Sequence, residues 1–268
     1  LGGRKKQHPV LLDLLIAMTG RAHKSGVDLA ENRRLACEIH VDLPDQYDDA
    51  IWPMLGWLAG SKSPNGVPIL FGLEATNPTN DDLKALCAAF GTTSGAPLLH
   101  VHEHTPEGDL PPIKGAHQCA ITKQDLVELW QNFNSATDNV DLVAIGSPHA
   151  SFSECQKFAA LLAGAQCHQD TKTIVTIGRH TLESLSKAGV LDQLEQAGVT
   201  VIPDICWCSI TEPVFPVDAA TLMTNSGKYA HYGKGLSGRD IRFGSLRDCA
   251  KAAVSGVVLN ALPWWLKE

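Results

Sequence analysis

The stretch Val140-Asp141-Leu142-Val143-Ala144-Ile145-Gly146 is apolar almost throughout and predicts a buried β-strand. Further strands and helices are predicted after it, alternating over links of a few residues. The predicted helices are 153–162, 182–188 and 190–197, and the predicted strands are 173–177 and 199–205. Such alternation is typical of βαβ units around a parallel sheet. The second half of the chain therefore predicts an α/β fold whose ligands bind beyond the carboxyl ends of the strands.

Patterns in the first half of the chain predict strands and helices as well, but they alternate less regularly. Its predicted strands are 35–41, 67–73 and 96–101, and its predicted helices are 10–18, 51–58, 80–90 and 122–132. We expect residues 1–118 to form one α/β portion. Residues 119–268 are expected to form a doubly wound α/β domain that carries a C-terminal ligand-binding loop.

The overall charge excludes some classes of partner. The 268 residues carry a formal charge of −7, and the isoelectric point is near 5.9. A protein that binds nucleic acid or an acidic membrane surface needs a basic face, so neither partner is expected. No apolar run reaches the roughly 18 residues that a membrane span requires.

The start of the chain and its cysteines indicate the cellular setting. The chain begins with Leu1 rather than methionine, so we expect further sequence before it. No signal segment opens the chain. Among the eight cysteines, Cys87, Cys155 and Cys249 lie in helical patterns, where buried free thiols are common. A reducing cytoplasm is therefore the expected location.

The polar tract 223–232 is the strongest candidate for a binding site. It contains an amide, two hydroxyls, an ammonium, two phenols and an imidazole around one glycine. Convergent donors on a short glycine-containing turn can surround one carboxylate. We therefore predict that Asn225, Ser226 and Lys228 face a small, charged ligand.

Three predicted strand ends carry further polar or reactive residues: the loops 146–149, 178–180 and 206–208. The first presents Ser147 and His149 at a helix start, where an anion can bind. On the spacing alone, a simple turn capped by a following serine is the commoner explanation of the same residues. The serine does not stand in the G-x-S-x-G pattern of a hydrolase elbow.

Histidines alternate in His100-Val101-His102-Glu103-His104, before Thr105-Pro106-Glu107. On a strand the three imidazoles would share one face and could bind zinc or iron. Solvated histidines at a strand end are commoner, and one of them lining a pocket is the expectation that we keep. Cys206, at the end of an apolar run, is a metal ligand, a nucleophile or a core thiol.

Several of these segments, in the same order, resemble the large subunit of aconitase X, a branch of the aconitase superfamily. The segments that carry the resemblance are Thr19-Gly20-Arg21, Gly26, Glu31-Asn32-Arg33, Gly72-Leu73, Asp82-Leu83-Lys84-Ala85-Leu86, Ala88-Ala89, His100, Thr105-Pro106-Glu107, Gly146-Ser147-Pro148-His149, Asp204-Ile205-Cys206, the run from Thr224 to Tyr232, the run from Arg242 to Leu246, and Cys249. The resemblance covers nearly all of the chain, and it is the ordered set that makes it specific.

The resemblance implies an aconitase-like fold and a hydro-lyase that uses iron as a Lewis acid, held as a [2Fe-2S] cluster or as a single iron. Known members look like dehydratases of cis-3-hydroxy-L-proline or of phosphorylated mevalonate. The family's iron is held by three cysteines, and Cys206 matches one of them. Ser147 stands where many members have cysteine, and the third ligand would precede Leu1. A small subunit or a fused small domain is the implied partner.

We therefore predict a dehydratase of a small hydroxy acid. The predicted catalytic residues are His149, Lys228 and Ser226, the predicted substrate-binding residues are Asn225, His100, Thr105 and Ser147, and the predicted metal ligand is Cys206. Beyond Lys228 and Arg179 the candidate loops are not basic, so cis-3-hydroxy-L-proline is preferred over a phosphorylated substrate. The alternatives are a phosphomevalonate dehydratase and a non-catalytic member of the family.

Overall fold

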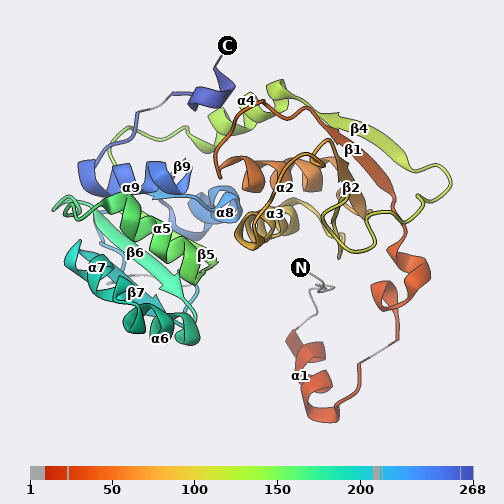
Figure 1. Cartoon of the computed structure of the whole chain (residues 1–268), viewed down its shortest axis with the longest axis horizontal. Coiled ribbons are helices and arrows are strands. Elements are labelled where there is room, and N and C mark those ends of the chain that lie inside the picture. The colour runs from red at the N-terminus through yellow and green to blue at the C-terminus, as the bar shows by residue number, and fades with distance from the viewer. Residues whose placement is uncertain (1–9, 23, 208–211, 213, 260, 268) are drawn as a thin grey trace.

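Two parallel β-sheets flanked by helices make up the protein (Figure 1). The structure is a computed structural model that describes residues 10–22, 24–207, 212, 214–259 and 261–267. The first sheet has the strand order β3-β2-β1-β4, and the second has the order β7-β6-β5-β8-β9. Every pairing within these sheets is parallel. The predicted α/β class with parallel sheets is confirmed.

The first sheet and its helices form what we call the first unit, residues 35–133. Its elements are β1 (Cys37–Val41), α2 (Ile51–Lys62), β2 (Pro68–Phe71), α3 (Asn80–Thr93), β3 (His100–Val101), β4 (His117–Ile121) and α4 (Lys123–Phe133). Capping boxes at Thr79 and Thr122 begin α3 and α4. Before this unit lie α1 (Val10–Thr19) and two short 3-10 helices, η1 (Gly26–Asp28) and η2 (Ala30–Arg33).

The second sheet and its helices form the second unit, residues 140–255. Its elements are β5 (Leu142–Ala150), α5 (Phe152–Leu162), β6 (Lys172–Ile177), α6 (Arg179–Lys187), α7 (Val190–Gln196), β7 (Val199–Pro203), β8 (Thr221–Thr224), α8 (Gly227–Ser237), β9 (Asp240–Phe243) and α9 (Leu246–Ser255). A last 3-10 helix, η4 (Trp264–Leu266), packs back on the first unit through the buried Trp265.

The polar tract 223–232 differs from its prediction as a loop. Thr221–Thr224 is a buried strand, and a helix begins at Gly227. Ser226 caps that helix, because its Oγ accepts a hydrogen bond from the backbone N–H of Tyr229 at 3.1 Å. The Tyr229 ring is buried against Trp207, with ring centroids 3.9 Å apart. The phenol that looked like a ligand contact is therefore part of the core.

The expected division between residues 118 and 119 falls inside β4. That strand pairs with β1, where Ile39 lies opposite Cys119, and α4 packs on the same unit. The chain passes from the first unit to the second through residues 134–139, after α4 has ended.

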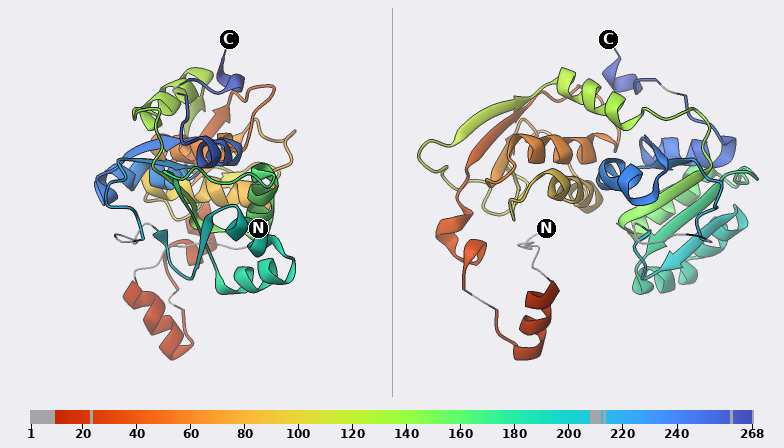
Figure 2. Two further views of the ribbon diagram at one scale, coloured as in Figure 1. Left: turned by 90° about the vertical axis from the view of Figure 1, so that its left-hand side faces the viewer. Right: turned by 180° about the vertical axis from the view of Figure 1, so that it is seen from behind.

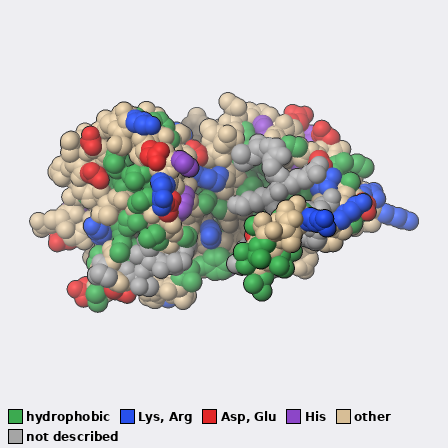
Figure 3. Space-filling model, turned by 90° about the horizontal axis from the view of Figure 1, so that it is seen from below, with side chains coloured by type: hydrophobic (Ala, Val, Ile, Leu, Met, Phe, Trp, Pro, Cys, Tyr) green, Lys and Arg blue, Asp and Glu red, His purple; other side chains and the backbone are tan. Residues whose placement is uncertain are grey.

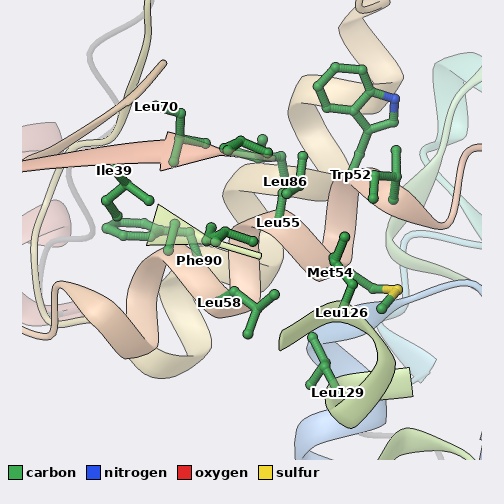
Figure 4. Packing of buried hydrophobic residues seen from close by; sticks show 14 of the residues in the cluster. Ile39, Trp52, Met54, Leu55, Leu58, Leu70, Leu86, Phe90, Leu126 and Leu129 are labelled. Carbon is green, nitrogen blue, oxygen red and sulfur yellow. The ribbon is translucent and has the colours of Figure 1, made fainter. Parts of the chain in front are cut away.

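The hydrophobic core of the first unit, part of which is shown in Figure 4, also includes Phe243 of the second unit. Phe243 of β9 packs edge-on against Phe133 of α4, with ring centroids 5.3 Å apart. Gly227 lies so close to α2 that an added Cβ would stand 2.8 Å from the Cβ of Pro53. Helix α8 therefore lies directly against the first unit, and the relative position of the units is set by packing.

Helix α1 projects away from both sheets (Figure 2). Its apolar side chains are exposed, with Leu11 at 73% and Met18 at 74% of their full accessibility. In the described part of the chain, no helix is both long enough and apolar enough to cross a membrane.

Candidate functional site

The largest cavity of the site, about 1100 Å³, lies between the two units, and we call it the interdomain cavity. The surface is hollowed in this region when the molecule is seen from below (Figure 3). The first unit contributes α3 and the segments 98–101 and 105–107. The second unit contributes the turn between β5 and α5, together with Gly178 and Thr181 at the start of α6. The position beyond the strand ends agrees with the general rule for parallel sheets.

His100 and Thr105 reach this cavity from the first unit, as the sequence predicts. His100 is only 4% exposed, and burial lowers the pKa of its imidazole, so the ring is neutral at pH 7. Its Nδ1 lies 3.5 Å from the Thr105 hydroxyl. That hydroxyl in turn accepts a hydrogen bond from the Val101 backbone N–H at 2.9 Å. The buried Nε2 of His100 has no hydrogen-bond partner in the described part of the chain.

The other two histidines of the predicted row are separated from His100. Strand β3 ends at Val101, so His102 and His104 lie in the turn that follows. His102 Nδ1 lies 3.1 Å from a Glu74 carboxylate oxygen, and His104 Nε2 lies 2.9 Å from the Leu73 carbonyl. The three imidazoles do not converge, and a three-histidine metal site is absent here.

His149 faces the same cavity from the second unit. His149 lies in the last part of β5, which follows Gly146, where φ is +111° and an added Cβ would stand 2.3 Å from the Thr176 carbonyl oxygen. Only glycine fits this backbone position. The His149 Nε2 atom is 3.0 Å from the Ile205 carbonyl and donates to it, which leaves Nδ1 as the nitrogen that can accept a proton.

Ser147, Asn225 and Ser226 meet around a smaller cavity of about 20 Å³ beside the larger one. The Ser226 hydroxyl donates to the Ser147 carbonyl, which joins the end of β8 to the β5–α5 turn. Ser147 is 3% exposed and Ser226 is 7% exposed. The predicted residues do come together, but these two serines are placed as structural contacts of the turn.

Lys228 lies apart from these residues. It is half-buried in the first turn of α8 and lines none of the cavities described here. Within the described residues its ammonium group makes no hydrogen bond or ion pair, whereas the capping residue Ser226 beside it makes several.

Cys206 follows β7 and is half-buried. Asp204, which precedes it, adopts a left-handed backbone with φ of 60° and accepts a hydrogen bond from the Arg179 backbone N–H at 2.8 Å. That bond, together with the Arg179 guanidinium, lowers the pKa of the Asp204 carboxyl. Cys208 lies outside the described residues. Across the described ranges, no three His, Cys, Asp or Glu side chains converge to hold a metal ion.

A second cavity of about 480 Å³ lies between α3, α5 and the starts of α2 and α9, and it was not predicted from the sequence. Carboxylates from the N-terminal ends of α2 and α3 line it, among them Asp48 and Asp82, and Lys157 and Arg247 face them from the second unit. Burial and the neighbouring Asp49 raise the pKa of Asp48 to about 6. Acids just before a helix were the available signal, but they are so common at helix starts that they indicate no site.

Comparisons with known proteins identify the two units. The family model described as the aconitase X second domain matches residues 35–131, and the model described as the aconitase X third domain matches residues 140–255. The solved structure of aconitase X from Thermococcus kodakaraensis, in its holo-form, superposes with a TM-score of 0.82 at 27% identity, over 94% of this chain and 64% of that chain.

The curated relatives include dehydratases that are named for two different substrates. The whole chain is 38% identical to a cis-3-hydroxy-L-proline dehydratase from Hypocrea jecorina and 39% identical to one from Pseudomonas aeruginosa, covering 46% and 47% of those proteins. It is 28% identical over 89% of its length to the phosphomevalonate dehydratase large subunit of Methanocaldococcus jannaschii, covering 60% of that protein. The chain thus spans about half the length of these two cis-3-hydroxy-L-proline dehydratases.

Proposed function

This chain belongs to the aconitase X family, and from this membership we infer that it forms the second and third domains of a dehydratase. Such an enzyme is a hydro-lyase, which removes water from a small hydroxy acid. The observation that carries the proposal is the similarity of the entire chain to two cis-3-hydroxy-L-proline dehydratases. The interdomain cavity between the two matched domains supports it, because a small ligand fits a space of this size.

We propose cis-3-hydroxy-L-proline as the substrate. Among the described residues that line the interdomain cavity, Lys84 is the only lysine or arginine. Its ammonium is held by the carboxylates of Asp81 and Glu154. A phosphorylated substrate requires cations that are available to its phosphate oxygens. A substrate without a phosphate group therefore suits this wall better.

The reaction requires one group that accepts a proton from carbon and others that hold the substrate. We assign the first role to Nδ1 of His149, since its Nε2 donates to the Ile205 carbonyl. His100, which burial keeps neutral, and Thr105 orient the substrate from the opposite wall. Asn225 is proposed to bind substrate from the adjoining small cavity.

The family resemblance also implies iron, which would act as a Lewis acid on the leaving hydroxyl. The described residues do not fit a three-thiolate centre, because no three Cys, His, Asp or Glu side chains converge among them and a serine hydroxyl at Ser147 is a harder ligand than a thiolate. Further ligands would have to come from outside the described residues. Iron analysis of anaerobically purified full-length protein, wild type against Cys206→Ala, tests whether this thiol takes part.

A partner is proposed on similar grounds. The archaeal relatives are named large subunits, and this chain covers only part of each relative. We propose that a small subunit, or a small domain of the same polypeptide, completes the enzyme.

The function is tested with the full-length protein and its partner domain. The protein is incubated with cis-3-hydroxy-L-proline and, separately, with phosphomevalonate, and mass spectrometry follows the loss of one water. We expect turnover of the first substrate, and we expect His149→Ala to reduce kcat by at least about a hundredfold. Turnover of phosphomevalonate alone would overturn the substrate assignment, and turnover of neither would overturn the proposed function.

A further inference from the structure

Lys84 of α3 joins the two units at the edge of the interdomain cavity. Its Nζ donates to the Asp81 carboxylate at 3.0 Å within its own helix. It also donates to the backbone carbonyl of His149 at 3.2 Å and to the carboxylate of Glu154. Two of its three acceptors therefore belong to the second unit, on the turn between β5 and α5.

The acceptors of Lys84 are themselves tied together. Ser151 begins α5 with a capping box, in which its N–H donates to the Glu154 carboxylate at 2.7 Å and its Oγ accepts from the Glu154 N–H at 3.1 Å. The Ser151 hydroxyl donates to Asp81 at 2.8 Å. Lys84 thus contacts the same carboxylate that caps α5, and the capping serine contacts α3 in return. We call Asp81, Lys84, Ser151 and Glu154 the α3–α5 cluster.

The cluster is partly shielded from water. Its charged side chains are 27% exposed at Lys84, 19% at Asp81 and 17% at Glu154. Burial alone lowers the pKa of Lys84, but the two carboxylates outweigh it and the pKa is raised overall. The ammonium group therefore stays charged at neutral pH and keeps all three contacts.

We propose that Lys84 is a positioning residue of this enzyme: it fixes the His149 backbone and the start of α5 against α3, so that His149 faces His100 across the interdomain cavity. This inference rests on the proposed function for its catalytic consequence. Its structural part stands on the contacts alone.

The contacts of Lys84 control the position of the His149 backbone more than they control the stability of the fold. The ion pairs of Lys84 keep some contact with water, so losing this lysine should lower the melting temperature only modestly. A displaced catalytic group, in contrast, can slow a reaction about a hundredfold when it moves by about 1 Å. A large loss of kcat with little loss of stability is therefore the signature of positioning.

Lys62 provides a matched control. Its Nζ lies 3.1 Å from the Asp125 carboxylate, and the two side chains are 25% and 27% exposed. Asp125 is also the carboxylate of a capping box, the one that begins α4. The pair differs from Lys84 and Glu154 in two ways, since both of its members lie in the first unit and neither lines the interdomain cavity.

The experiment compares Lys84→Met, Lys84→Arg and Lys62→Met in the full-length protein, with two measurements. The first is amide hydrogen exchange without substrate. We expect the amides of Ser151 and Glu154 to exchange at least about tenfold faster in Lys84→Met, and those of Thr122 and Asp125 to do so in Lys62→Met. The second is steady-state kinetics with cis-3-hydroxy-L-proline.

For the kinetics we expect Lys84→Met to lower kcat about ten- to a hundredfold with a small change in KM. Lys84→Arg should recover part of the loss, and Lys62→Met should match wild type. Unchanged exchange at Ser151 and Glu154 in Lys84→Met would overturn the positioning role, whatever the kinetics show. Faster exchange with wild-type kcat would overturn its consequence for catalysis. If the wild-type protein does not turn over the substrate, the proposed function fails, while the exchange data still decide the positioning.

Discussion

Replacing Ser226 with alanine separates two roles for this residue, a structural one and a catalytic one. The substitution removes the N-cap of α8, in which Oγ accepts from the Tyr229 N–H at 3.1 Å. Loss of a serine cap costs about 1 kcal/mol. It also removes the hydrogen bond to the Ser147 carbonyl, which lies in a buried turn. A buried hydrogen bond contributes about 1–1.5 kcal/mol. We therefore expect Ser226→Ala to lower the free energy of unfolding by about 2–2.5 kcal/mol.

Ser245→Ala is the matched control for this prediction. Ser245 is 1% exposed and caps α9, where its Oγ accepts from the Asp248 N–H at 3.2 Å. Its hydroxyl donates to the Asp248 carboxylate at 2.8 Å, so its second hydrogen bond stays within the same turn. We expect Ser245→Ala to lower the free energy of unfolding by only about 1 kcal/mol, the typical contribution of a serine cap.

Urea denaturation of the two variants measures the difference, and thermal melting checks it, since about 1 kcal/mol shifts the midpoint by roughly 2–4 °C in a protein of this size. Ser226→Ala should be the less stable variant by about 1–1.5 kcal/mol. A cost no larger than that of Ser245→Ala would refute the structural reasoning. If kcat then fell a hundredfold at unchanged stability, the hydroxyl would act in the chemistry, as the sequence alone predicted.

Three further predictions concern single residues. Because Lys228 lines none of the three cavities, Lys228→Met should leave kcat/KM near the wild-type value; a loss of about tenfold or more, which a charge-assisted contact worth about 1.5–3 kcal/mol would cause, would instead place Lys228 in the site, as the sequence alone predicted. Asp48→Asn should stabilise the protein at pH 7. The pKa of Asp48 in the folded protein is about 6, above its ordinary value, so ionisation of this carboxyl destabilises the wild type as the pH rises from about 4 to 6. Urea denaturation should therefore show equal stability of the two proteins below about pH 4. Phe243→Ala should cost about 3–5 kcal/mol in urea denaturation, because this ring is 1% exposed and packs between the units; a cost below about 1 kcal/mol would contradict that packing.

The sequence predicted β5, β6 and β7, but it missed β8, which is buried throughout. The run 140–146 became β5, and 173–177 and 199–205 became β6 and β7, because continuous apolar runs between turns have few other uses. It did not predict β4, His117–Ile121, in which only Ile121 is buried. An edge strand whose residues face water lacks the apolar pattern that marks its neighbours.

Two of the predicted site residues lie on strands of different sheets. His100 begins β3 and His149 lies near the end of β5, and the structure brings both to one cavity, while their roles stay predictions. Asp81 and Lys84 were missed because they read as ordinary surface residues of an amphipathic helix. Their partners lie about 65–70 residues away in the chain, and such a distance leaves no pattern in a single sequence.

Each unit supplies only one wall of the interdomain cavity, so whatever fixes the units relative to each other also determines the site. Helix α8 packs directly on α2, because Gly227 lies so close to Pro53 that a side chain in its place would collide with it. A hydrogen bond from Trp57 Nε1 to His231 Nδ1, at 3.1 Å, joins the same two helices. The α3–α5 cluster joins the two units through charge, close to His149 itself. Packing of this kind tolerates little displacement, whereas an ion pair can open and close without disturbing the core. The packing of α8 therefore sets the distance between the two walls, and the α3–α5 cluster acts within it on the position of His149.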